Sequence, residues 1–261
     1  TKGTLRVFLT DLNCNPVELL KTERELLKER GFSDEELGSW EITVDEKENQ
    51  DWSKKWKEKW TVTHVTDKIA VVPSWLTYEP KEGEITITLD PGCAFGTGTH
   101  QTTQLCMKAI EKYLKKGDKV ADIGTGSGIL SICAIKFGAS SAYGCDIDDT
   151  VIDVCRENAK INGIDVDYPQ GEGNPAPVKF ELNTADKITE KFDFVCANIL
   201  HNVLAEIMGD LKNIMKDNAK MSLSGILDEK KPIVLEAIER EGLKIIDTIS
   251  QDQWISFVVT K

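Results

Sequence analysis

The feature that most constrains the fold is a buried strand that runs into a glycine-rich turn and then into an apolar helix. The stretch reads VADIGTGSGILSICAIKFG and places its glycines at Gly124, Gly126 and Gly128. Glycine at a strand-to-helix turn lets the backbone come close to a ligand, and the start of the helix presents N–H groups that have no partner within the helix. The sequence therefore predicts a cofactor site at this turn.

Seven segments with the character of strands follow one another from residue 120 onward. They are Val120–Ile123, Ala142–Asp146, Val178–Leu182, Phe192–Asn198, Lys220–Leu223, Leu243–Ile249 and Ile255–Thr260. Helical patterns follow the first, second, fourth and fifth of them, which predicts an α/β fold with a doubly wound, mainly parallel sheet of seven strands. Only SQDQ separates the last two strands, which is too short for a crossover, so we expect an antiparallel hairpin at the sheet edge.

The spacing of the glycines and of a following acid indicates the kind of cofactor. Asp146 ends the second strand, 22 positions beyond Gly124, where a carboxylate can accept hydrogen bonds from a ribose diol. A dinucleotide fingerprint has a third glycine three positions after Gly126, where this chain has Ile129. The G-x-G-x-G spacing favours S-adenosylmethionine, which carries no pyrophosphate. Binding of a nucleotide or NAD, or a tight turn without a ligand, are the alternatives.

A polar side chain closes the fourth strand, FDFVCANIL, at Asn198. In doubly wound sheets, ligands bind in the crevice at the carboxyl ends of the strands. A side-chain amide there can accept a hydrogen bond from an amine and aim its lone pair at a methyl group. The alternative is that Asn198 caps the helix that begins near His201.

Charge and composition exclude several classes of function. The formal net charge of -12 argues against direct nucleic-acid binding and favours a basic partner. We find no apolar run long enough for a membrane span and no secretory signal. Seven scattered cysteines without a C-x-x-C pair predict reduced, mostly buried thiols and a cytoplasmic protein. His64, His100 and His201 lie too far apart for a zinc pattern, so we expect no metal.

Two segments precede the repeated strands and helices. Residues 4–45 read as strand, helix, strand: TLRVFLTD, PVELLKTERELLKERG and SWEITVD. Trp52, Trp56 and Trp60 then share one face of a predicted helix, which either packs on a neighbouring domain or recognises a partner. From Lys68 onward, KIAVVPSW and EITITLD read as short strands. We therefore predict an N-terminal domain over 1–48, a helical linker over 49–65 and a cofactor-binding domain over 66–261.

Several motifs together resemble the ribosomal protein L11 methyltransferase family (PrmA) of class I S-adenosylmethionine-dependent methyltransferases. They are PSW, LDPGCAFGTGTHQTT, DIGTGSGILSICAIKFGA, GCDID, ANIL and LSGIL, and the resemblance runs from about Asp51 to the C-terminus. It implies that the first glycine-rich turn folds over a cofactor held by the second. The implied cofactor-binding residues are Thr103, Gly124, Gly126, Gly128, Asp146 and Asn198, with Phe95, Thr99 and His100 on the covering loop. A buried structural role is the alternative for His100.

The resemblance also implies an activity. We expect methyl transfer from S-adenosylmethionine to lysine side-chain or N-terminal amines of a large-subunit ribosomal protein by a monomeric enzyme, with Asn198 orienting the amine and no assigned general base. The family adds a ferredoxin-like recognition domain with two strand-helix-strand halves, whereas residues 4–45 supply one, so we expect a truncated domain.

Other functions remain open from the residues alone. A methyltransferase of the same fold acting on a small-molecule amine or another protein is the main alternative. A cofactor-binding protein without catalysis, acting through its acidic surface, is the second. A nicotinamide oxidoreductase is disfavoured by Ile129, which stands where that fingerprint has glycine.

Overall fold

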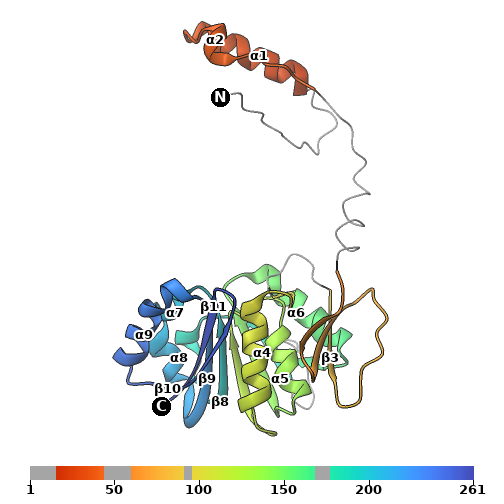
Figure 1. Cartoon of the computed structure of the whole chain (residues 1–261), viewed down its shortest axis with the longest axis vertical. Coiled ribbons are helices and arrows are strands. Elements are labelled where there is room, and N and C mark those ends of the chain that lie inside the picture. The colour runs from red at the N-terminus through yellow and green to blue at the C-terminus, as the bar shows by residue number, and fades with distance from the viewer. Residues whose placement is uncertain (1–15, 44–59, 91–95, 168–176) are drawn as a thin grey trace. The chain divides into compact units, whose positions relative to one another are not determined.

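The structure is a computed structural model in which the chain divides into two compact units, residues 1–58 and 59–261. The described residues are 16–43, 60–90, 96–167 and 177–261 (Figure 1). The second unit carries the glycine-rich turn.

In the first unit the structure describes two helices, α1 (Pro16–Glu29) and α2 (Asp34–Leu37). The helix predicted from PVELLKTERELLKERG is confirmed as α1. The strand predicted from SWEITVD is wrong over its described part, because residues 39–43 belong to no strand. An extended segment is stabilised by hydrogen bonds to a neighbouring strand, and the described part of this unit offers none. TLRVFLTD lies outside the described residues, so the ferredoxin-like domain stays a prediction.

The second unit begins with a small sheet in the order β1-β2-β3. Its strands are β1 (Thr63–Thr66), β2 (Ile69–Pro73) and β3 (Ile85–Leu89), with β1 antiparallel and β3 parallel to β2. The two strands predicted from KIAVVPSW and EITITLD are confirmed. The predicted helical linker is wrong at its C-terminal end, because residues 60–62 are loop and β1 follows. The β-branched Thr63 and Thr66 of β1 pair with residues of the buried β2. Residues 49–59, with Trp52 and Trp56, lie outside the described residues.

The large sheet contains all seven predicted strands. Its members are β4 (Lys119–Ile123), β5 (Ser141–Asp146), β6 (Val166–Asp167), β7 (Val178–Leu182), β8 (Phe192–Asn198), β9 (Met215–Leu227), β10 (Lys244–Gln251) and β11 (Trp254–Thr260). The order is β10-β11-β9-β8-β4-β5-β7-β6. The predicted hairpin is confirmed: β10 is the edge strand, and β11 runs antiparallel to both β10 and β9. The two-residue β6 was not predicted, because so short an edge strand has no readable period.

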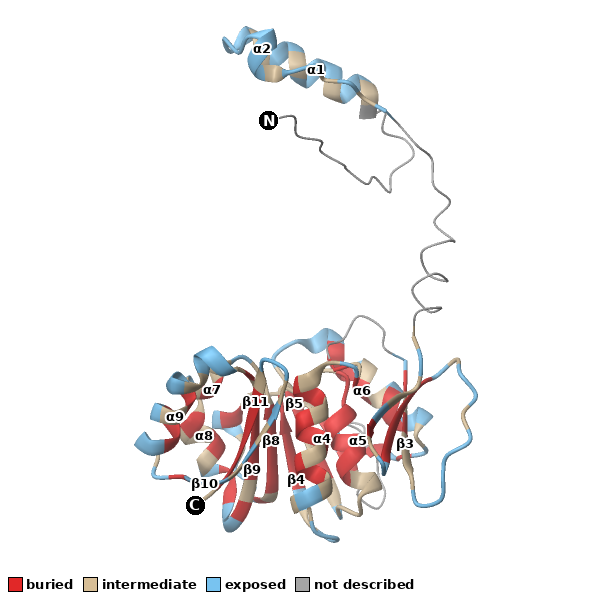
Figure 2. Ribbon diagram, viewed as in Figure 1, coloured by how far each residue is buried: buried red, intermediate tan, exposed pale blue. Residues whose placement is uncertain are grey.

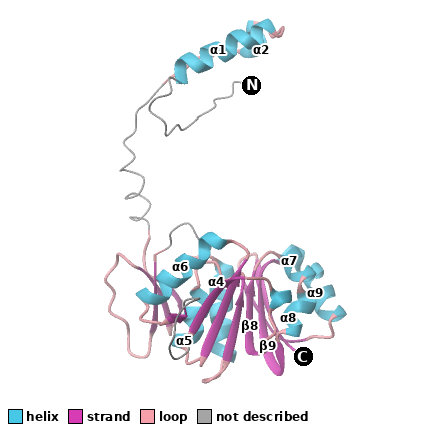
Figure 3. Ribbon diagram, turned by 180° about the vertical axis from the view of Figure 1, so that it is seen from behind, coloured by secondary structure: helices cyan, strands magenta, loops and turns pink. Residues whose placement is uncertain are grey.

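Helices cover both faces of this sheet (Figures 1 and 3). One face packs against α4 (Gln101–Tyr113), α5 (Ile129–Lys136) and α6 (Asp149–Ile161), and the other against α7 (His201–Glu206), α8 (Met208–Asn213) and α9 (Lys231–Arg240). Alternate residues of β8 divide between the two cores: Phe194 faces the first and Val195 the second. Burial is therefore continuous along the central strands (Figure 2). The chain order reverses between β4 and its neighbours β5 and β8, which opens a crevice at their carboxyl ends.

The described cysteines are all in these cores. Five are free and buried, as predicted: Cys106, Cys133, Cys145, Cys155 and Cys196. Burial raises the pKa of the Cys106 thiol to about 12, so it stays protonated and unreactive at neutral pH. In the described part of the chain, no helix has the length and apolar character needed to cross a membrane.

Candidate active site

The glycine-rich turn between β4 and α5 is fixed to both neighbouring strands. The Gly124 amide donates a hydrogen bond of 2.9 Å to the Cys145 carbonyl of β5. On the other side, a Cβ added at Gly124 would lie 2.4 Å from Cγ2 of Ile199, which follows β8. Gly124 also has a φ of +71°, which other residues rarely adopt. Glycine is therefore required at the position where the turn meets the end of β8.

Asp146 is held against the same turn by three backbone amides. The Gly126 amide donates to Oδ2 at 3.0 Å, and the amides of Ile147 and Asp148 donate to Oδ1 at 2.8 and 3.2 Å. These bonds fix the carboxylate and leave a lone pair on Oδ2 for a ligand hydroxyl. Ile147 is 80% exposed, so it offers an apolar contact directly beside the carboxylate. The arrangement suits an adenosine group.

A second carboxylate, Asp122, lies fully buried under the turn. Its Oδ2 accepts hydrogen bonds from the Thr125 hydroxyl at 2.8 Å and from the Ser131 amide and hydroxyl at 3.1 and 2.9 Å. Its Oδ1 has no partner among the described residues. Burial outweighs these bonds and raises the pKa of Asp122 to about 6. This residue joins the turn to the first turn of α5.

The two glycine-rich segments are in direct contact. The buried Ser127 hydroxyl donates to the Gly96 carbonyl at 2.6 Å. Asn158 of α6 donates to the Ser127 carbonyl at 2.9 Å and accepts from the Asp90 amide, which follows β3, at 3.1 Å. Residues on both sides of segment 91–95 are thus bonded to the turn or to α6. Phe95, predicted on the covering loop, lies outside the described residues.

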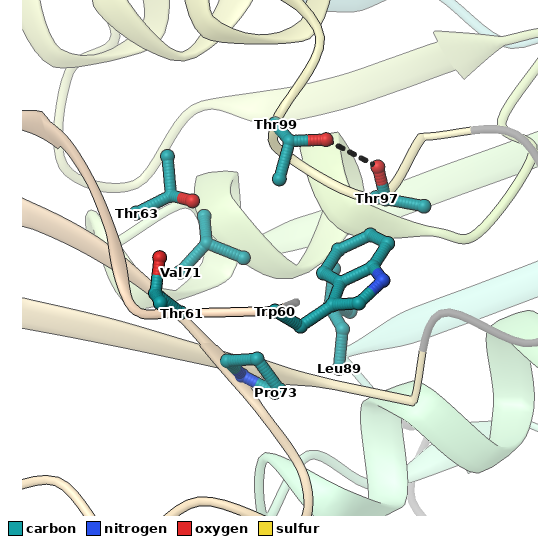
Figure 4. Close-up of a pocket in the computed structure, with 8 residues that line it drawn as sticks. All are labelled: Trp60, Thr61, Thr63, Val71, Pro73, Leu89, Thr97 and Thr99. Atoms are coloured by element: carbon teal, nitrogen blue, oxygen red, sulfur yellow. Dashed lines mark hydrogen bonds between the residues drawn. The ribbon is translucent and has the colours of Figure 1, made fainter. Parts of the chain in front are cut away.

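His100 and Thr99 lie at the start of α4. The His100 ring caps this helix, because Nδ1 accepts from the Thr102 amide at 3.3 Å, and its edge faces Trp254 with the ring centroids 5.0 Å apart. These contacts give His100 a structural role at the start of α4. Thr99 lies 2.9 Å from Thr97, oxygen to oxygen. Both line a small pocket whose other residues are Trp60, Thr61, Thr63, Val71, Pro73 and Leu89 (Figure 4).

Asn198 and Thr103 meet at the carboxyl end of β8. The side-chain amide of Asn198 donates to the Thr103 hydroxyl at 3.3 Å. Its Oδ1 is buried and has no partner among the described residues. The N-cap of α7 is Leu200, so Asn198 does not fill the capping role that was the alternative. An unpaired buried oxygen costs about 1–3 kcal/mol, which a ligand N–H at this point would offset.

These contacts link most of the predicted site residues into one region, which contains Thr99, His100, Thr103, Gly124, Gly126, Gly128, Asp146 and Asn198. Sequence reasoning did not identify Asp122, Ser127, Asn158 or Trp254. Asn158 could have been found, because Asn158 and Asn162 lie one helical turn apart in ENAKING and therefore share a face of the helix. That face accepts hydrogen bonds from the backbone at the end of β3. No spacing indicated that Trp254 meets His100.

The strand order and the turn with its acid define a class I methyltransferase fold. The sequence profile of the ribosomal protein L11 methyltransferase (PrmA) family matches residues 16–261. The chain belongs to this family and is a methyltransferase.

Individual relatives agree with this assignment. The ribosomal protein L11 methyltransferase of Bacillus velezensis is 38% identical over 229 residues, which cover 87% of this chain and 71% of the relative. That of Alkaliphilus oremlandii is 36% identical over 244 residues, or 93% of this chain and 74% of the relative. The crystal structure of the ribosomal protein L11 methylase from Lactobacillus delbrueckii subsp. bulgaricus superimposes with a TM-score of 0.70 at 32% identity, covering 77% of this chain and 99% of that one.

Proposed function

We propose that this protein transfers methyl groups from S-adenosylmethionine to lysine side-chain or N-terminal amines of a large-subunit ribosomal protein. The observation that carries the proposal is the buried Oδ1 of Asn198 at the carboxyl end of β8, beside the glycine turn, which has no hydrogen-bond partner among the described residues. The names of the relatives supply the acceptor. The net charge of -12 suits a basic protein substrate in the cytoplasm.

The residues present suit S-adenosylmethionine. Gly124, Gly126 and Gly128 let the backbone approach the ligand, and Asp146 would accept hydrogen bonds from the ribose hydroxyls. Ile147 would provide an apolar surface for the adenine ring, since its side chain is 80% exposed. When bound, S-adenosylmethionine supplies an electrophilic methyl group on a sulfonium.

The chain's own part in the chemistry is to bind and orient the amine. A free lysine amine has a pKa of about 10.4 and must be neutral to attack, and removal from water lowers that pKa. The Asn198 Oδ1 would accept an N–H of the amine and direct the nitrogen lone pair at the methyl carbon. The new N–C bond forms as the S–C bond breaks, and the nitrogen then releases its proton to water. Alignment supplies most of the rate enhancement, so no general base is assigned.

Methyl transfer to purified ribosomal protein L11 tests the proposal. We expect incorporation of labelled methyl into L11 and much less into a panel of small amines. Asn198→Ala should lower turnover about 100-fold, because the amine loses its orienting acceptor, with little effect on S-adenosylhomocysteine binding. Asn213→Ala, at the exposed end of α8, is the matched control and should keep wild-type turnover.

Two outcomes would contradict the proposal. Transfer to small amines but not to L11 would assign a small-molecule substrate. Tight cofactor binding with no transfer to any acceptor, unchanged by Asn198→Ala, would indicate a binding protein without catalysis.

A further inference from the structure

The strand β9 is irregular where it passes the candidate active site. Its pairing with β11 shifts register so that Ser224 and Gly225 together stand opposite the single residue Ser256, which forms a β-bulge. On its other edge, β9 pairs Ser224 with Asn198 of β8. Bulges bend a strand and re-aim its side chains, and they are frequent beside active sites. The LSGIL motif therefore places its irregularity next to the residue proposed to orient the amine.

Ser224 connects this bulge to the start of α4. Its side chain is fully buried, and its hydroxyl donates to the Thr102 carbonyl at 3.0 Å. Thr102 precedes Thr103, whose hydroxyl accepts from Asn198 at 3.3 Å. Ser224 thus holds the first turn of α4 at the distance at which Thr103 reaches Asn198.

Gly225 holds the backbone next to Asn198, the other residue of the contact between Thr103 and Asn198. A Cβ added there would lie 2.2 Å from the carbonyl oxygen of Ile199 and 2.8 Å from its carbonyl carbon. Both atoms belong to the backbone, so no side-chain rotation relieves the overlap. Gly225 also has a φ of +86°, which disfavours any other residue. The backbone directly after Asn198 therefore keeps its place only while residue 225 has no side chain.

Ile199 also packs against the glycine-rich turn. Its Cγ2 occupies the space in which a Cβ on Gly124 would lie, at 2.4 Å. Ile199 is therefore enclosed by Gly225 of β9 on its backbone and by Gly124 on its side chain. Movement of β9 at the bulge would be transmitted to both the end of β8 and the glycine turn.

We infer that Ser224 and Gly225 are positioning residues for methyl transfer, because they fix the two segments that carry Thr103 and Asn198. The inference rests on the proposed role of Asn198. If the bulge served only folding, its substitution would lower stability without a separate loss of turnover.

Two variants and two matched controls separate these cases. Ser224→Ala removes the hydroxyl, and Gly225→Ala adds the overlapping methyl group. Ser222→Ala removes a fully buried hydroxyl from the same strand, one that lies 3.4 Å from the Ser256 hydroxyl. Gly242→Ala adds a methyl at a φ of +67° where no heavy atom lies within 4 Å. The Ser222 hydroxyl also donates to Cys106 Sγ in the second turn of α4 at 3.7 Å, but it contacts neither the Thr102 carbonyl nor the backbone after Asn198. The controls therefore share the chemistry and the backbone strain but not the two contacts under test.

The first readout is kinetic. With L11 as acceptor, we expect kcat to fall about tenfold in Ser224→Ala and about 100-fold in Gly225→Ala, while the dissociation constant of S-adenosylhomocysteine changes by about threefold or less. The second readout needs no acceptor. The side-chain amide NMR signals of Asn198, assigned by their absence in Asn198→Asp, should move in both variants and stay in place in both controls.

The inference is overturned if Ser224→Ala and Gly225→Ala change kcat and the Asn198 signals no more than Ser222→Ala and Gly242→Ala do. If Gly225→Ala does not fold, Ser224→Ala decides by the same comparison. If the wild-type protein transfers no methyl group to L11, the proposed substrate fails, and the Asn198 signals alone decide the positioning role.

Discussion

At the scale of single residues, the carboxyl group of Asp122 is fully buried under the glycine turn. Folding raises its pKa from 3.8 to about 6, because burial disfavours the charged form. The folded protein therefore binds this proton more tightly than the unfolded chain does. Between pH 3.8 and about pH 6, the unfolded chain loses this proton while the folded protein keeps it, so the unfolding free energy falls as the pH rises. Above about pH 6 the folded protein carries the buried charge, and the loss of stability is complete.

Asp122→Asn tests this, because the variant has no group that titrates there. We expect the unfolding free energy of the wild type, relative to the variant, to decline by on the order of 2 kcal/mol between pH 4 and pH 7. Urea denaturation of both proteins across that range measures it. Parallel pH dependence of the two proteins would contradict the assigned pKa.

Some residues of the site could be predicted from the sequence, and others could not. Asp146 could be placed because its distance from Gly124 along the chain reflects one strand-helix-strand unit. The contact between Asn198 and Thr103 joins residues 95 positions apart, and no spacing rule gives that register. The need for glycine at 225 depends on the approach of one particular carbonyl group, which is a property of the packed sheet alone.

At the scale of elements, the short side chain of Ser127 makes a direct hydrogen bond between the described parts of the two glycine-rich segments. Ser127→Ala would leave the Gly96 carbonyl without its buried donor, at a cost of about 1–3 kcal/mol. We expect weaker S-adenosylhomocysteine binding, by about tenfold, measured by calorimetry. Ser140→Ala, which removes an exposed hydroxyl bonded to the Asp118 carbonyl, should leave the affinity unchanged. Equal affinities in all three proteins would mean that the two segments bind the cofactor independently.

The strands of the large sheet were predictable because strands buried on both faces read as short apolar runs between turn signals. Elements at the margins were not. The sequence places most of β1 in the linker, because charged residues and tryptophans at helical spacing precede it. Residues 39–43 have a strand-like sequence without a described partner to pair with. At both places the pairing of strands, and not the intrinsic propensity of the residues, decided whether a strand formed.

At the scale of the whole molecule, the chain divides into two units between residues 58 and 59. This division predicts that the second unit folds and binds the cofactor without the first. A chain shortened to residues 59–261 should melt within a few degrees of the full chain and keep its affinity for S-adenosylhomocysteine, because both described cores lie in this unit. If the first unit recognises the substrate, the shortened chain should lose methyl transfer to L11. Full transfer by residues 59–261 would contradict that role.

The central claim is that the glycine turn, Asp146 and Asn198 form one S-adenosylmethionine site. Calorimetric titration with S-adenosylmethionine, S-adenosylhomocysteine and NAD tests it most directly, with Asp146→Ala as the variant. Asp149→Ala is the control, since Asp149 is an exposed carboxylate in the first turn of α6. We expect binding of both adenosyl ligands, no binding of NAD, and a loss of affinity in Asp146→Ala that Asp149→Ala does not share. Absence of adenosyl binding, or equal affinity in Asp146→Ala, would contradict the account.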